Sequence, residues 1–73
     1  MIITRNLMIT IIPKEAGDAL ETALADTSER ARIEADVERA IRGYLILRSL
    51  MTEYLEAEPG IIVVTIQENG NNA

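Results

Sequence analysis

The side chains that could carry chemistry in this chain are mostly carboxylates. Its 73 residues include no histidine and no cysteine, so the commonest general base, the thiol nucleophile and the thiolate zinc ligand are missing. Glu34 with Glu38, and Glu53 with Glu56, have the spacing of neighbours on a helix, and such carboxylates can hold a divalent cation through oxygen. A solvated acidic surface explains the same pattern more simply. We therefore expect no enzyme activity, no metal site and no cofactor.

These carboxylates lie on a predicted helix from about Glu29 to Glu56, which also carries two rows of apolar side chains. At about 100° per residue, the first row fills one ordinary buried face. Its members are Ile33, Val37, Ala40, Ile41, Tyr44, Leu47, Met51 and Leu55. The second row lies beside the first at i, i+4, i+8 spacing and consists of Ile46, Leu50 and Tyr54.

One helix in contact with one sheet cannot cover both apolar rows. Because small monomers rarely expose large apolar patches, we expect a homodimer or a higher oligomer. The predicted oligomer interface consists of Tyr44, Ile46, Leu47, Leu50, Met51 and Tyr54. In the alternative, the second row packs under the first helix of the same chain.

A shorter helix is expected before the long one. Its apolar stripe consists of Ala16, Ala19, Leu20, Ala23 and Leu24. From Leu24 to Ile33 is nine residues, which would place the two stripes on opposite sides of one continuous helix. We therefore predict a break at residues 26–28, where Asp26 and Glu29 have capping-box spacing and the two residues after Asp26 are alternative caps.

Two β-strands are predicted to flank the helices. Residues 2–12 (IITRNLMITII) are rich in β-branched side chains and alternate apolar with polar positions, and Pro13 suits the first turn of the helix that follows. Residues 61–67 (IIVVTIQ) form a second apolar run after a Pro-Gly turn. The sequence therefore predicts a small α+β domain of β-α-α-β order over residues 1–68, with a flexible tail at 69–73. Its strands would pair within one chain or across a homodimer.

Composition and charge exclude several classes of protein. Hydrophobic residues make up 48% of the chain, too many for a disordered protein. The formal net charge of -5 opposes non-specific attraction to nucleic acid or to an anionic membrane. No apolar run reaches the roughly 18 residues of a membrane span, and the first residues lack the pattern of a signal peptide. We expect a cytoplasmic protein with no membrane partner.

Residues 9–45 (ITIIPKEAGDALETALADTSERARIEADVERAIRGYL) contain a predicted strand, Pro-Lys-Glu, an Ala-Leu-rich helix, a short turn and a second helix. This order resembles the ribbon-helix-helix family of dimeric DNA-binding proteins. The resemblance implies N-terminal strands that pair across a dimer and enter the DNA major groove, as in autorepressors and antitoxins. Counted back from Pro13, the outward strand positions are apolar. One inserted residue would instead present Thr4, Asn6, Met8 and Thr10 to the bases, of which only Asn6 offers the bidentate amide suited to adenine.

Three functions are consistent with these patterns. The leading hypothesis is a non-enzymatic acidic oligomer that binds another protein with a basic surface, as an inhibitor, adaptor or assembly factor. Its binding face would consist of Asp18, Glu21, Asp26, Glu34, Glu38, Glu53 and Glu56. The alternatives are a ribbon-helix-helix-like autorepressor or antitoxin, and a structural subunit of a larger assembly.

Overall fold

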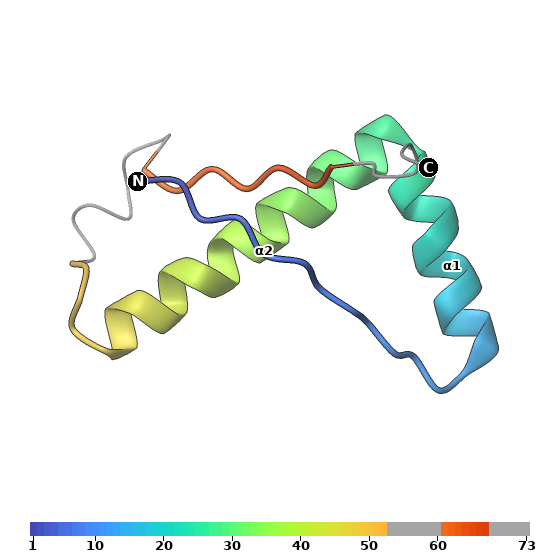
Figure 1. The fold of residues 1–73 in the computed structure, drawn as a ribbon, viewed down its shortest axis with the longest axis horizontal. Helices are drawn as coiled ribbons and strands as arrows, with labels where there is room; N and C mark the ends of the chain where they lie inside the picture. The colour runs from blue at the N-terminus through green and yellow to red at the C-terminus, as the bar shows by residue number, and fades with distance from the viewer. Residues whose placement is uncertain (53–60, 68–73) are drawn as a thin grey trace.

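The computed structural model describes residues 1–52 and 61–67. In this part the chain forms two helices, α1 (Lys14–Ala25) and α2 (Thr27–Leu47), which meet at a sharp bend (Figure 1). The described residues contain no β-strand, so the predicted α+β class with β-α-α-β order is wrong, and this part of the chain is helical. The predicted break between the two helices is confirmed. The predicted tail at 69–73 lies outside the described residues.

Asp26 sets the bend between the helices. Its backbone is extended, and its carboxylate accepts hydrogen bonds from the N–H groups of Ser28 at 2.9 Å and Glu29 at 3.1 Å. Two of the N–H groups that every helix start leaves open are thereby satisfied. The Leu24 carbonyl accepts a further hydrogen bond from Arg30 Nε at 2.8 Å, which ties the end of α1 to the start of α2. Asp26 is therefore the N-cap, as its spacing from Glu29 predicts.

The end of α2 comes earlier than the predicted Glu56. After Leu47, Ser49 adopts a left-handed backbone with φ of 60°. The Ser49 N–H bonds to the Ile46 carbonyl at 3.0 Å, and the Leu50 N–H bonds to the Leu45 carbonyl at 2.9 Å. These two bonds form a Schellman motif, which satisfies carbonyls that the last helical turn leaves open. The apolar pattern continues past this point, but the backbone of Ser49 ends the helix.

Two extended segments take the place of the predicted strands. Residues 1–12, named here the N-terminal arm, lead into α1, and residues 61–67 run along α2 (Figure 1). Residues 61–67 bond to side chains of α2 and not to another strand. An alternating apolar pattern shows that a segment favours one covered face, but a strand forms only where a second strand supplies the ladder. Both strand predictions fail because the described residues supply no such pairing.

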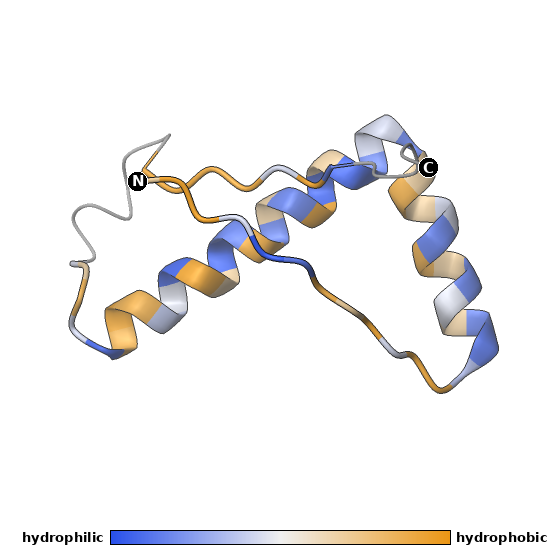
Figure 2. Cartoon of the chain, in the orientation of Figure 1, coloured by the Kyte–Doolittle hydropathy of each residue, from blue (hydrophilic) through white to orange (hydrophobic). Residues whose placement is uncertain are grey.

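The described residues build no buried core. None of them is fully buried, and half-buried apolar side chains occur mainly where α1 meets α2 and where residues 61–67 face α2. Figure 2 shows apolar positions at intervals along the N-terminal arm and along α2. Much of the apolar surface that drives folding in small proteins is therefore still in contact with water.

Candidate protein-binding surface

A partly exposed row of apolar side chains runs along α2. Val37, Ile41, Tyr44 and Leu47, named here the α2 stripe, have exposed fractions of 39%, 38%, 56% and 85%. Their spacing of three or four residues places them on one face of the helix. The sequence predicts this face to be the buried one. The described part of the chain leaves it open to solvent.

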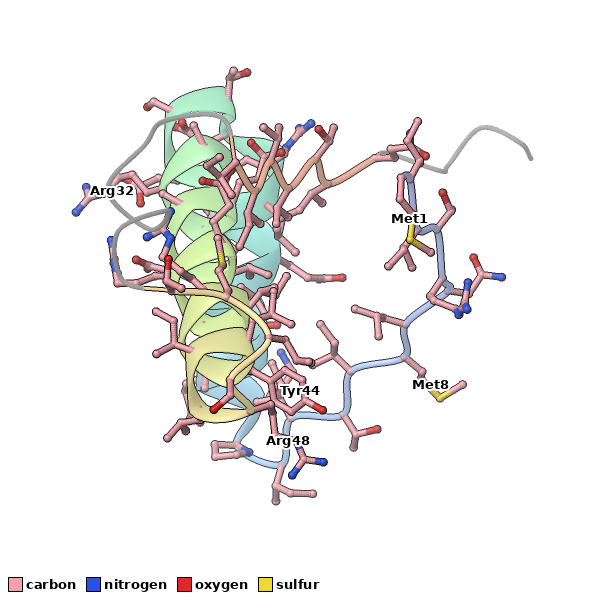
Figure 3. All side chains as sticks on the ribbon, turned by 90° about the vertical axis from the view of Figure 1, so that its left-hand side faces the viewer. Met1, Met8, Arg32, Tyr44 and Arg48 are labelled. Atoms are coloured by element: carbon pink, nitrogen blue, oxygen red, sulfur yellow. The ribbon has the colours of Figure 1, made fainter. Side chains whose placement is uncertain are left out.

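Arg48 lies at the C-terminal end of the α2 stripe. Its guanidinium carbon is 5.7 Å from the centre of the Tyr44 ring, and Figure 3 shows the two side chains together at that end of the helix. An exposed cation–π contact of this kind contributes about 0.5–1 kcal/mol. The apolar row therefore ends in an exposed charge, as is typical of the rim of a protein interface.

The six predicted interface residues do not share one environment. Two of them belong to the α2 stripe, and Leu50 is 71% exposed beyond the end of the helix. Ile46 and Met51 are half-buried, and Tyr54 lies outside the described residues. The exposed apolar surface is therefore centred on the first predicted row. Val37 and Ile41 were missed as interface residues because their helical spacing indicated an ordinary core face.

Most of the predicted acidic face is already engaged within the chain. Asp18 forms an ion pair with the lysine one turn earlier at 2.8 Å, and Asp26 caps α2. The two α2 glutamates of this set bind residues 61–67, as described next. Glu21 is exposed and has no ionic or hydrogen-bond partner in the described part of the chain. Glu53 and Glu56 lie outside the described residues.

Glu34 and Glu38 hold residues 61–67 against α2. Glu34 Oε2 accepts the Ile66 N–H at 2.8 Å, and Glu38 Oε2 accepts the Val64 N–H at 3.0 Å. The two glutamates are four residues apart, which is a rise of about 6 Å along the helix. Their partners are two residues apart, which is about 6.6 Å along an extended segment. The spacings therefore match, and the segment runs antiparallel to α2. The even-numbered residues 62, 64 and 66 are half-buried, whereas the odd-numbered ones are exposed. The sequence indicates only that the two glutamates share a face, because their backbone partners are 32 and 26 residues away.

Arg42 continues the row of Glu34 and Glu38 by one more helical turn. It is half-buried, and its Nε atom is buried without a hydrogen-bond partner in the described part of the chain. A buried donor left unpaired costs about 1–3 kcal/mol. An acceptor from outside the described residues would remove that cost.

The N-terminal arm is exposed along residues 1–10. The four positions that the DNA-binding alternative assigns to base contacts therefore face solvent: Thr4, Asn6, Met8 and Thr10. The side chain of Arg5 donates a hydrogen bond to the carbonyl of its neighbour Thr4 at 2.9 Å. Figure 3 shows Met1 and Met8 on the part of the arm that stands away from the helices.

An open groove of about 370 Å³ lies between the arm and α1. Its apolar lining comes from Ile9, Ile11, Gly17, Leu20 and Leu24, and its charged edge from Lys14, Asp18 and Glu21. A Cβ atom added at Gly17 would lie 3.8 Å from Ile11 Cβ, which is ordinary van der Waals contact. The base of the arm therefore lies beside α1.

The described residues expose apolar side chains on the N-terminal arm and on α2. Among the described residues, no group of three or more acidic side chains is placed to hold a metal ion. Neither described helix has the length and apolar character needed to cross a membrane. No protein-family model, curated protein or solved structure matches the chain.

Proposed function

We propose that this chain is a non-enzymatic binding protein that self-associates through the α2 stripe and contacts another protein as an oligomer. The observation that carries this proposal is the exposed apolar row on α2 in a chain whose described residues have no buried core. Soluble monomers rarely leave such a row in water, and a second copy presents the same row without requiring any new surface.

The size of the chain, 8.1 kDa, supports the same proposal. A chain of this size commonly completes its core by oligomerisation.

The partner of the oligomer is proposed from charge. The net charge of -5 favours a protein with a basic surface by electrostatic complementarity. Among the described residues of the predicted acidic face, Glu21 on α1 is the carboxylate left exposed and unpaired for such a contact. An inhibitor, an adaptor or an assembly factor in the cytoplasm would meet this description, and so would a structural subunit of a larger assembly.

Analytical ultracentrifugation of the full chain tests self-association directly. We expect a dimer or larger species at micromolar concentration, with helical circular dichroism that decreases on dilution as the oligomer dissociates. Ile41→Asp, in the α2 stripe, should shift the protein towards monomer. Ala35→Asp adds the same charge to the exposed opposite side of α2 and should leave the oligomer intact. A stably helical monomer at micromolar concentration would contradict the proposal.

A further inference from the structure

We propose that Glu34 and Glu38 protect residues 61–67 from forming an intermolecular β-sheet. The two carboxylates occupy backbone donors along one edge of this segment, so a strand from another chain cannot pair with that edge. This role is independent of the proposed self-association, because the contact lies within one chain and operates in a monomer and in an oligomer alike.

Residues 61–67 (IIVVTIQ) have the composition of a segment that forms cross-β aggregates. All of them except the last are β-branched, and none is charged, proline or glycine. Segments of six or seven residues with high β-propensity, low net charge and no proline are those that stack into fibrils. An extended segment of this kind is therefore prone to aggregation wherever its backbone edges are free.

Helix α2 engages one edge of the segment, which runs along it in Figure 1. The Ile66 N–H donates to Glu34 Oε2 at 2.8 Å, and the Val64 N–H donates to Glu38 Oε2 at 3.0 Å. In an extended chain the N–H groups of alternate residues point to the same edge. Within the described residues, the opposite edge has no hydrogen-bond partner. A fibril needs a neighbouring strand on both edges of every segment, so one occupied edge is enough to stop its growth.

The same contact covers one side of the segment. Ile62, Val64 and Ile66 are half-buried, whereas Ile61 and Val63 on the other side are 42% and 71% exposed. The paired sheets of a fibril interdigitate their side chains in a dry interface, and a side chain that faces α2 is not available for this. The two hydrogen bonds therefore withhold both an edge and a side of the segment from other chains.

Aggregation of a double variant tests the proposal in the full chain. Glu34→Ala with Glu38→Ala is compared with Glu15→Ala and Glu21→Ala, which remove the same charge from exposed positions of α1. Thioflavin T fluorescence and sedimentation follow the formation of β-rich aggregate. We expect the α2 variant to aggregate roughly tenfold faster or more, because each lost hydrogen bond raises the fraction of released segment about fivefold. Equal rates in the two double variants would overturn the proposal.

A conservative variant separates hydrogen bonding from charge. Glu34→Gln with Glu38→Gln removes the same two charges but keeps an acceptor oxygen at each position. We expect it to aggregate more slowly than the corresponding alanine variant. If the two aggregate equally fast, the loss of charge causes the aggregation and the hydrogen bonds do not protect the segment.

A further substitution identifies the segment that aggregates, even if the alanine variant loses part of its helical structure. Val63→Lys, added to Glu34→Ala with Glu38→Ala, places a charge on the exposed side of the segment, where it opposes stacking. Ile3→Lys is the matched control in the N-terminal arm, where the side chain is 66% exposed. We expect Val63→Lys to restore slow aggregation and Ile3→Lys to leave it fast. Aggregation that Val63→Lys does not slow would overturn the proposal.

Discussion

At the scale of single residues, local hydrogen-bonding chemistry was predictable. The carboxylate of Asp26 accepts backbone N–H groups two and three residues later, so every partner lies within one turn. Such a cap depends on residue type and spacing alone. Ser49 was not predictable in the same way. Its left-handed φ of 60° occupies a position where glycine or asparagine is usual, and no nearby residue in the sequence signals a helix end there.

The cap at Asp26 predicts a specific pH dependence. The Glu29 backbone N–H first, then the Ser28 hydroxyl and the Ser28 backbone N–H, hold the pKa of this carboxyl below its ordinary value of 3.8. A lowered pKa means that the folded state binds the proton less well than the unfolded state. The stabilisation is therefore fully present above about pH 3.8 and is lost as the pH falls through the lower folded value.

Two substitutions at Asp26 test this dependence by circular dichroism between neutral pH and pH 2. Asp26→Ala should have less helix than wild type at neutral pH, and the difference should narrow as the pH falls below about 3.8. Asp26→Asn keeps an oxygen that caps the helix but cannot titrate, so it should resemble wild type at neutral pH and exceed it in acid. A difference between wild type and Asp26→Ala that does not vary with pH would contradict the assignment.

At the scale of elements, helices were predictable and the extended segments were not. The phase difference between the apolar stripes before and after Asp26 required a break, which the structure has between Ala25 and Thr27. A helix satisfies its backbone from residues four positions away. An extended segment must find its partners elsewhere, and residues 61–67 find them in the carboxylates of Glu34 and Glu38. No local pattern distinguishes that arrangement from a strand.

The contact between α2 and residues 61–67 gives a second prediction. Glu34→Leu removes the acceptor of the Ile66 N–H, and a hydrogen bond of this kind contributes about 1 kcal/mol net. Amide exchange at Ile66, followed by NMR, should therefore become roughly fivefold faster. Glu34→Gln keeps an acceptor oxygen and should change the rate less.

The exchange experiment has an internal control and an external one. The exposed odd residues Val63 and Thr65 have no hydrogen bond to α2 among the described residues, so their amide exchange should respond little to Glu34→Leu. Glu21→Leu changes an equivalent carboxylate on α1 and should leave Ile66 unaffected. An unchanged Ile66 rate in Glu34→Leu would show that this hydrogen bond does not hold the segment.

At the scale of the whole molecule, charge and exposed apolar area point to different kinds of partner. The arm is exposed and the α2 stripe is partly exposed in the described residues, and this apolar area is why we propose a second copy of the chain as a partner. The net charge of -5 favours a basic protein and opposes a polyanion. The sequence predicts self-association through Tyr44 and the residues after it, and this stays a prediction; the structure adds that Val37 and Ile41 on the same helix are also partly exposed.

A DNA-binding measurement distinguishes the proposed protein-binding function from the ribbon-helix-helix-like alternative, because an acidic chain should bind DNA poorly. Several of the chain's cations are already engaged, since Lys14, Arg32 and Arg39 form ion pairs with carboxylates. The chain has 7 cationic side chains against 12 carboxylates, which gives no net attraction for phosphates, and phosphate contacts supply most non-specific affinity. We expect no complex with the duplex DNA that flanks the gene, measured by fluorescence anisotropy at about 50 mM salt. A complex that weakens steeply towards about 200 mM salt, and that Asn6→Ala weakens while Ala35→Asn does not, would instead show that the exposed arm reads DNA.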